Sequence, residues 1–522
     1  MQACSNDVAT TMTTRPIRFF HRGQLTEVQD AAPTRSVLDW LREDARCTGT
    51  KEGCNEGDCG ACTVVIGSLA APGAPEAVRG LVLETVNACI QFLPTLDGKA
   101  LFTVEDLKRI APPGSLHPTQ QAMVDCHGSQ CGFCTPGFVM SMWSAYEHHQ
   151  ACGTRPTRQQ MADELSGNLC RCTGYRPILD AGQRMFDLPP APLDTAPVVT
   201  ALTRLAADAG PGASFEYAAG AHFHAPRRLD EFAAVRERLP KAQLLAGSTD
   251  VGLWVNKQLR ELGDIVYIGD VESLKRIEAH EDGLWIGAAA SLETAWRALA
   301  ARWPTLTDVW LRFASPPIRH AGTMGGNVAN GSPIGDSAPV LMALDASLEL
   351  RRGERVRRVP LDAFYTDYMK NRLEAGEFVQ AILIPKLPAA RQVRAYKISK
   401  RFDCDISALC AGFSIELDAD RVREVRLAYG GLAGVVKRAA AAEAALRGQP
   451  WNADAVARAQ TAIADDFKPL TDMRASAAYR LQVATNLLQR FWLETRATDP
   501  LPASATSVWS VMPHRTGAEQ GA

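Results

Sequence analysis

The sequence predicts a multidomain α+β protein, and three observations support this prediction. The chain has 522 residues, more than one hydrophobic core usually holds, so several domains are expected. Strand-like and helical patterns alternate along most of its length. The cysteines are unevenly distributed, because 12 of the 14 precede residue 173. We therefore expect a cysteine-rich first part and a larger α+β second part.

Composition excludes several functional classes. The chain is 46% apolar and 22% charged, as in ordinary globular proteins. Its formal net charge of −2 argues against bulk electrostatic binding to nucleic acids or membranes. No apolar run is long enough for a membrane span, and the first residues lack the pattern of a secretory signal. We expect a cytoplasmic protein.

Residues 15–98 predict a small β-grasp ferredoxin-like domain. Residues 15–28 have the alternation of a hairpin, and a short helix is expected over 36–44 with Ser36 as its N-cap. A cysteine loop follows, and then a strand at Thr63–Ile66. Four cysteines of this domain form a pattern. Three of them have the C-x4-C-x2-C spacing of plant-type 2Fe–2S ferredoxins, and the fourth follows at a distance, as in those proteins. The four cysteines are Cys54, Cys59, Cys62 and Cys89.

Residues 99–187 predict a bundle of four helices. Thr135 is expected to cap one helix, and Thr157 with Gln160 to form a capping box for another. This unit contains a C-x2-C pair and a C-x-C pair, formed by Cys131, Cys134, Cys170 and Cys172. Four thiolates in one small domain indicate a second metal site. Zinc is the alternative to a 2Fe–2S cluster, whereas a Rieske centre would need histidine ligands that the pattern lacks.

The rest of the chain is predicted to be α+β. Residues 188–214 are rich in Pro, Ala and Gly and predict an extended linker. Residues 215–390 contain two polar, glycine-rich turns, Leu244–Gly252 and Phe313–Asp336. Such turns expose backbone N–H groups that can hold a pyrophosphate, but no G-x-G-x-x-G motif opens a helix, so a Rossmann site is not supported. Residues 391–515 form the last α+β unit.

Three stretches around these cysteines resemble the iron–sulfur domains of molybdenum hydroxylases: Gly53–Cys62, Cys126–Gly137 and Gly167–Ile178. The resemblance implies two 2Fe–2S clusters, one held by each cysteine quartet described above. It also implies that Gln130 faces the pterin of a molybdenum cofactor in a partner; an exposed loop amide is the alternative. The six remaining cysteines are expected to be buried apolar thiols: Cys4, Cys47, Cys126, Cys152, Cys404 and Cys410.

The two glycine-rich turns resemble the flavin domain of the same family. This implies a two-lobed α+β FAD-binding domain, followed by a C-terminal flavoprotein lobe. Phe313 would lie against the isoalloxazine, and Lys397 would contact the cofactor unless it is an ordinary strand-edge charge. The family has Asn-Thr-Glu where this chain has Ser248-Thr249-Asp250, so the role of Asp250 is the least defined. The implied FAD contacts are Leu245, Ala246, Gly247, Ser248, Thr249, Asp250, Phe313, Thr323, Gly326, Asn327, Ser332, Asp336 and Lys397.

Within the family, the arrangement resembles the small subunit of bacterial xanthine dehydrogenases. The resemblance implies purine oxidation at molybdenum in a separate large subunit, in a dimer of heterodimers, with electrons passing through the helical-domain cluster, the ferredoxin-like cluster and FAD to NAD. No residue pattern calls for acid–base or nucleophilic catalysis. The alternatives are a related hydroxylase for aldehydes, heterocycles or aryl-CoA thioesters, a partner-free NADH-oxidising flavin reductase, and a non-enzymatic iron–sulfur sensor or scaffold.

Overall fold

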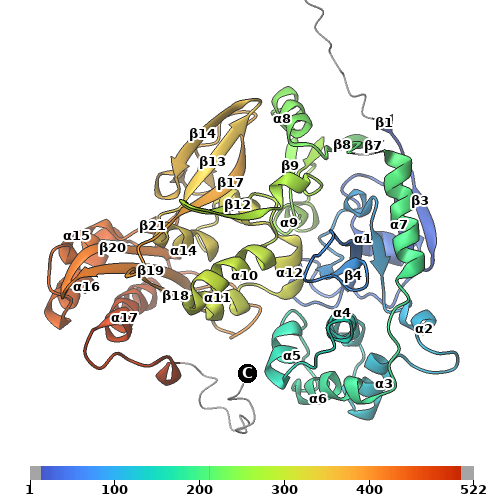
Figure 1. Ribbon diagram of the computed structural model, residues 1–522, viewed down its shortest axis with the longest axis horizontal. Coiled ribbons are helices and arrows are strands. Elements are labelled where there is room, and N and C mark those ends of the chain that lie inside the picture. The colour runs from blue at the N-terminus through green and yellow to red at the C-terminus, as the bar shows by residue number, and fades with distance from the viewer. Residues whose placement is uncertain (1–12, 211, 507–522) are drawn as a thin grey trace, which may run out of the picture.

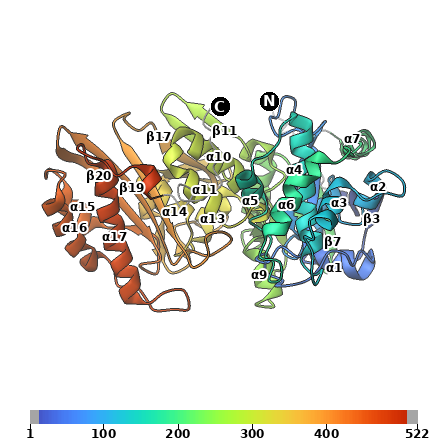
Figure 2. The same ribbon diagram turned by 90° about the horizontal axis from the view of Figure 1, so that it is seen from below.

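The computed structural model describes residues 13–210 and 212–506. The four domains occupy three successive regions along the long axis of the molecule, because the first two lie together at one end (Figure 1). The two cysteine-rich domains occupy one end, the glycine-rich turns belong to the middle, and the last domain forms the other end. The turned view in Figure 2 shows the same order. The multidomain α+β prediction is confirmed.

The first domain is a five-stranded sheet with the order β3-β2-β6-β4-β5. The predicted hairpin is present and turns at Arg22 and Gly23, both with positive φ. The Ser36 hydroxyl accepts the N–H of Asp39 as the predicted N-cap. Strand β6 lies beyond residue 98, the expected end of the domain, and pairs with β2 and β4. The elements are β2 (Ile17–His21), β3 (Gln24–Val28), α1 (Val37–Asp39) with a π-helical turn (Trp40–Asp44), β4 (Thr63–Leu69), β5 (Leu81–Asn87) and β6 (Ala100–Phe102).

The second domain is helical, as predicted. Thr157 and Gln160 form the expected capping box. The predicted cap at Thr135 is wrong, because Cys134 is the N-cap and Thr135 is already the first helical residue. The helices are α2 (Leu107–Ile110), α3 (Pro118–Asp125), α4 (Thr135–Cys152), α5 (Arg158–Glu164) and α6 (Arg176–Arg184).

The segment between the second and third domains is not the extended chain that its composition predicts. Residues Ala196–Ala209 form helix α7, which packs against β2 and β4 of the first sheet. Its buried residues are Val198, Leu202 and Leu205, spaced as one helical face requires. Pro197 in the first turn and Gly210 after the last residue suit helix ends. Burial of this apolar face therefore stabilises a helix here, despite the Pro- and Gly-rich flanks that predict an extended chain.

The third domain has the expected two lobes. One sheet has the order β1-β7-β8-β10-β9 and the other has the order β11-β12-β17-β13-β14. Strand β1 comes from the N-terminal end of the described chain and pairs with β7. The strands are β1 (Thr13–Thr14), β7 (Phe215–Ala219), β8 (Ala221–Ala225), β9 (Gln243–Leu245), β10 (Ile265–Tyr267), β11 (Ile277–His280), β12 (Gly283–Gly287), β13 (Ser347–Arg352), β14 (Arg355–Pro360), β15 (Tyr365–Asp367), β16 (Lys370–Asn371) and β17 (Phe378–Pro385). The helices are α8 (Leu229–Arg238), α9 (Val251–Asn256), α10 (Leu292–Arg302), α11 (Thr307–Arg312), α12 (Pro316–Ala321), α13 (Met324–Asn330) and α14 (Ser337–Ala343).

The last domain is a sheet with the order β18-β19-β20-β21, packed against α15, α16 and α17. Helix α14 of the third domain also packs on β19 and β20 and joins the two domains. The elements are β18 (Gln392–Ile398), β19 (Leu409–Asp418), β20 (Arg421–Gly430), β21 (Lys437–Arg438), α15 (Ala440–Leu446), α16 (Ala453–Asp466) and α17 (Ala477–Thr495). Residues 507–515, which we assigned to this domain, lie outside the described residues. Within residues 13–210 and 212–506, no helix is both long and apolar enough to span a bilayer.

Candidate redox cofactor sites

The first cysteine quartet gathers at the edge of the ferredoxin-like domain. The Sγ atoms of Cys62 and Cys89 are 3.4 Å apart, and both residues are almost fully buried. The Sγ of Cys54 accepts the backbone N–H groups of Asp58 and Cys59, each at 3.3 Å. The hydrogen bond from the Cys59 thiol, helped by these amides against the effect of burial, lowers the pKa of Cys54 to about 5. The same hydrogen bond, together with burial, raises the pKa of Cys59, so the loop favours a thiolate at Cys54, the form that binds iron.

Glycines let the backbone of this loop close around the sulfur atoms. A Cβ on Gly53 would lie 2.7 Å from the Sγ of Cys59. Gly57 and Gly60 have positive φ values of 78° and 70°, which favour glycine. Four gathered thiols, amides directed at sulfur and a tightly wrapped backbone together fit a 2Fe–2S cluster. The assignment of each cysteine as a ligand stays a prediction.

The second quartet lies where helices α4 and α6 begin. Cys134 interacts with Cys170, and Cys131 interacts with Cys172. Burial raises the pKa of Cys170, but hydrogen bonds from Thr173 outweigh it, so the net shift is downward. Cys131 and Cys172 are exposed. The four thiols fit a second cluster that, unlike the first, lies at the surface.

The two cysteine sites are in direct contact. The backbone N–H of Leu169, next to Cys170, donates to the carbonyl of Cys59 at 3.0 Å. The buried Asn168 amide donates to the carbonyl of Gly60 at 3.0 Å and to the Thr63 hydroxyl at 3.1 Å. These contacts therefore join the two residues that precede Cys170 to Cys59, Gly60 and Thr63 of the first cysteine loop. The role of Asn168 could not be recognised from sequence patterns, because the contact joins residues 108 positions apart.

The first cysteine loop also contacts the third and fourth domains. The Asn256 amide, in α9, donates to the carbonyl of Cys89 at 2.7 Å, and Lys257 donates to the carbonyl of Cys54 at 2.5 Å. From the last domain, the Cys404 thiol lies 3.3 Å from the carbonyl oxygen of Asp58. The first cysteine loop is thus enclosed between the helical domain and the middle of the molecule.

The two glycine-rich turns of the third domain meet. A Cβ on Gly247 would lie 1.8 Å from the carbonyl oxygen of Ala321, so only glycine permits this approach. The Gln91 amide, close to Cys89 in sequence, donates to the carbonyl of Gly247 at 3.0 Å. The first of the two turns therefore also touches the end of the first cysteine site.

These turns have the features of a cofactor site. Ser248 has a φ of 62°, which is uncommon for a residue other than glycine, and its buried hydroxyl has no hydrogen-bond partner among the described residues. Such an unpartnered group in a strained turn fits a bound ligand. The Thr323 hydroxyl caps α13 by accepting the Gly326 N–H at 3.0 Å. Leu245 is buried, whereas Asp250 is exposed.

Two further predicted flavin residues come together across a domain boundary. The Lys397 ammonium group lies 2.6 Å from the Asp336 carboxylate and 2.8 Å from the Ser407 hydroxyl. Ser407 in turn donates to Asp336 at 2.6 Å. Lys397 is only 3% exposed, so it is not an ordinary strand-edge charge. Sequence reasoning missed Ser407, since only the folded chain brings it to this pair.

Phe313 and Gln130 have contrasting surroundings. Phe313 is buried, and its ring centroid lies 5.7 Å from that of Trp296. Gln130 is exposed beside Cys131. Their roles toward the isoalloxazine and the pterin stay predictions.

The other predicted residues differ in their burial. Asn327 and Ser332 are half-buried in the second turn. Among the unassigned cysteines, Cys47, Cys404 and Cys410 are buried as expected, Cys126 is half-buried, Cys152 is exposed, and Cys4 lies outside the described residues.

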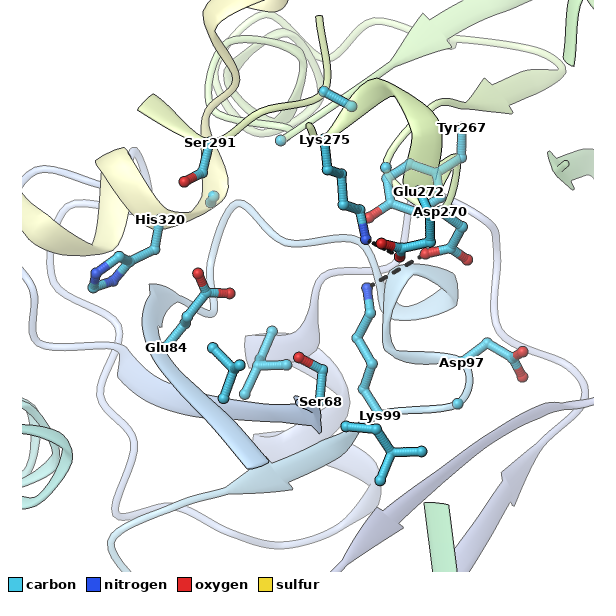
Figure 3. A pocket seen from close by; sticks show the side chains of 18 of the residues that line it. Ser68, Glu84, Asp97, Lys99, Tyr267, Asp270, Glu272, Lys275, Ser291 and His320 are labelled. Carbon is cyan, nitrogen blue, oxygen red and sulfur yellow. Dashed lines mark hydrogen bonds and ion pairs between the residues drawn. The ribbon is translucent and has the colours of Figure 1, made fainter. Parts of the chain in front are cut away.

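A cleft of about 700 Å³ separates the first and third domains. Three of the predicted flavin residues line it, namely Ala246, Gly247 and Thr323. Figure 3 shows Lys99 and Lys275 extending into it from opposite walls. Lys99 lies 3.7 Å from Asp270, and Lys275 lies 2.6 Å from Glu272. The cleft therefore adjoins the glycine-rich turns and is lined by paired charges.

Four family models match the chain in sequence order. A 2Fe–2S iron–sulfur cluster binding domain matches residues 19–91, and a [2Fe–2S] binding domain matches residues 103–183. The FAD binding domain in molybdopterin dehydrogenase matches residues 215–387. The CO dehydrogenase flavoprotein C-terminal domain matches residues 394–495. The two-cluster and FAD predictions are thereby confirmed at the level of domains.

Curated relatives include xanthine dehydrogenases and an aldehyde oxidase. The chain is 28% identical to xanthine dehydrogenase of Emericella nidulans, over 92% of this chain and 39% of the relative. It is 30% identical to xanthine dehydrogenase of Drosophila subobscura, over 80% and 34%. Aldehyde oxidase 4 of Cavia porcellus is 28% identical, over 92% and 39%. The chain thus spans less than half the length of these relatives.

A solved structure, the cyanide-inactivated form of a Cu,Mo-CO dehydrogenase, has 26% sequence identity and a TM-score of 0.49. The similarity covers 51% of this chain and 94% of that one. The domain matches do not depend on this structural similarity. Along its length the chain therefore matches, in this order, two 2Fe–2S domains, an FAD-binding domain and a CO dehydrogenase-type flavoprotein C-terminal domain.

Proposed function

We propose that this chain is the iron–sulfur and FAD subunit of an NAD-dependent xanthine dehydrogenase. It would carry electrons from the oxidation of hypoxanthine or xanthine at a molybdenum cofactor, held by a large partner subunit, to NAD. The family arrangement implied by the resemblance is a dimer of such heterodimers. When bound, the clusters supply one-electron transfer and FAD couples it to a two-electron acceptor. The protein contributes position, insulation and electrostatics.

The position of the first cysteine loop is the observation that carries this proposal. The loop contacts Leu169 and Asn168, which precede Cys170 and Cys172 of the second quartet. It also contacts Asn256 and Lys257, at the end of the helix that follows the first glycine-rich turn. These contacts support the order second cluster, first cluster, flavin, because the loop directly touches residues next to both of the other sites.

The exposed second quartet supports an entry point for electrons from a partner. Close to Cys131 and Cys172 in sequence, the side chains of Phe133 and Tyr175 are 47% and 39% exposed. Apolar surface beside a redox site favours a docked protein, which would also exclude water from the cluster. The exposure of Gln130 in the same loop supports its proposed role toward a partner's cofactor.

A related molybdenum hydroxylase is the second candidate. The similarity to aldehyde oxidase 4 equals that to the Emericella xanthine dehydrogenase in identity, at 28%. The substrate would be chosen by the pocket of the partner, so this chain would serve either reaction in the same way.

Purification of the tagged chain from its native host tests both candidates. We expect a molybdenum-containing chain to co-purify, with about four irons and one FAD per chain of this protein. The complex should reduce NAD with hypoxanthine or xanthine and act more slowly on aldehydes. Two irons, or zinc in place of iron, would contradict the two-cluster assignment. Faster oxidation of an aldehyde or a heterocycle would favour the second candidate, and full NADH-to-dye activity without any partner would favour a flavin reductase.

A further inference from the structure

Three side chains with metal-binding groups share one face of the β7–β8 hairpin, away from the cysteines and the glycine-rich turns. In the antiparallel register Glu216 pairs with His224. His222 lies two residues before His224 on the same strand, so both point to the same face. Glu216, His222 and His224 therefore meet because of the strand register and not through chance loop geometry.

The donor atoms of the three residues converge. The Nδ1 of His222 lies 3.1 Å from the Oε1 of Glu216, and the Nδ1 of His224 lies 3.6 Å from the same oxygen. All three donor atoms lie within 4.8 Å of one another. The imidazole rings stack, with centroids 5.7 Å apart and planes inclined by 8°. Each of the two imidazoles thus directs its Nδ1 atom at the carboxylate of Glu216.

His224 supplies a second, independent observation. The residue is only 6% exposed, yet its Nδ1 has no hydrogen-bond partner among the described residues. The 3.6 Å separation from Glu216 is too long for a hydrogen bond. A buried polar atom without a partner costs free energy and calls for an explanation. A bound cation on the Glu216 side of the ring would satisfy this nitrogen.

We propose that Glu216, His222 and His224 bind one divalent transition-metal ion of the zinc class. Zinc lies about 2.0–2.2 Å from nitrogen and oxygen ligands, so the edge of its tetrahedron is about 3.4 Å. The observed separations of 3.1 and 3.6 Å bracket this length. Two imidazoles and one carboxylate suit zinc, whereas calcium and magnesium prefer oxygen ligands alone.

The surroundings indicate an open site with a supported ligand. The His222 side chain is 52% exposed, so water can fill the remaining coordination position. The Asp264 carboxylate accepts the backbone N–H of His222 at 2.9 Å, which fixes the start of β8 beside β10. A metal ion here would cross-link the two strands of the hairpin. We therefore expect the ion to protect the hairpin against opening.

Zinc binding to the cluster- and FAD-loaded chain tests the proposal. The protein is first treated with a mild chelator, and its iron and FAD contents are verified. Equilibrium dialysis against zinc should show one ion per chain. His222→Ala and Glu216→Gln should each weaken zinc binding by at least about tenfold, without loss of iron or FAD. His280→Ala is the matched control, because His280 also lies near a glutamate, 3.4 Å from Glu278, and is similarly exposed.

A second readout separates ligation from simple folding defects. Zinc should slow hydrogen exchange across residues 215–225 in the wild type and in His280→Ala, but not in His222→Ala. His222 is exposed, so its replacement leaves the core intact, whereas replacement of the buried His224 could disturb folding. Equal zinc affinity in wild type, His222→Ala and Glu216→Gln would overturn the proposal. Zinc uptake that matches the loss of iron would assign binding to the cysteines and overturn it as well.

Discussion

The two cysteine quartets have opposite surroundings. In the first, Cys62 and Cys89 are 2% and 1% exposed, and three other domains contact the loop. In the second, Cys131 and Cys172 are exposed, although Cys134 is half-buried and Cys170 is buried. The same ligand chemistry is therefore insulated at one site and presented at the other. Under the proposed function, burial and not the set of cysteines would distinguish an internal relay from a point of entry.

The largest expected effect of this difference is on iron removal. Under reducing conditions, a bulky iron chelator should remove iron from the second site on the order of ten times faster than from the first, because the surrounding shell controls access. The two clusters can be followed separately by their electron paramagnetic resonance signals. Equal rates would show that the first site is as accessible as the second and would remove the contrast.

A pair of glycine substitutions compares the packing at the two sites. Gly60 and Gly174 have similar φ values of 70° and 67°. A Cβ on Gly60 would lie 2.2 Å from the carbonyl oxygen of Gly167, whereas nothing lies within 4 Å at Gly174. Gly60→Ala should cost about 3 kcal/mol and Gly174→Ala only about 1 kcal/mol, the cost of the left-handed conformation alone. Denaturant unfolding of the loaded chain measures both, and similar losses would mean that the contact with Gly167 is unimportant.

A smaller effect concerns the carboxyl group of Asp163 in α5. Burial raises its pKa to about 6, the Gln159 amide opposes the shift, and the nearby Asp403 carboxylate adds to it. Because the folded pKa exceeds the unfolded value of 3.8, the charged group costs stability as pH rises above 3.8, and this cost is complete above about 6. Asp403 belongs to the loop whose Cys404 contacts the first cysteine site.

Asp163→Asn removes this cost. The variant should be more stable than the wild type by about 1 kcal/mol at pH 8, a value reduced for partial solvent screening, and by less at pH 5. Thermal unfolding at the two pH values measures the difference. Gln159→Ala serves as the control, because losing its hydrogen bond to Asp163 should increase the cost. A gain in Asp163→Asn that is independent of pH would exclude the ionisation of Asp163 as the cause.

The cysteine quartets and the domain classes could be predicted from the sequence, because their signals are local. Spacing alone identified both quartets, and the capping box of Thr157 and Gln160 formed as expected. Helix α7 was missed because its Pro- and Gly-rich flanks hid an apolar face that only matters when β2 and β4 are present. The Asn168 contact with Gly60 could not be predicted, since it depends on how two domains dock.

The candidate flavin site shows the same limit. The glycine-rich turns could be recognised from their composition, but nothing in the sequence showed that Gly247 would meet Ala321. The predicted residues Asp336 and Lys397 proved to be buried partners, and Ser407 joined them only through the fold. Sequence patterns therefore located chemistry within each domain, while the contacts between domains had to come from the structure.

The central claim is that the exposed second site feeds the buried first site. The most direct test compares two activities in Cys131→Ser within the assembled complex, with Cys152→Ser as control because Cys152 is exposed in the same domain. Cys131→Ser should lower purine-to-NAD electron transfer by roughly two orders of magnitude while NADH-to-dye transfer stays within about twofold of the wild type. Equal loss of both activities, or loss of neither, would contradict the proposed order of carriers.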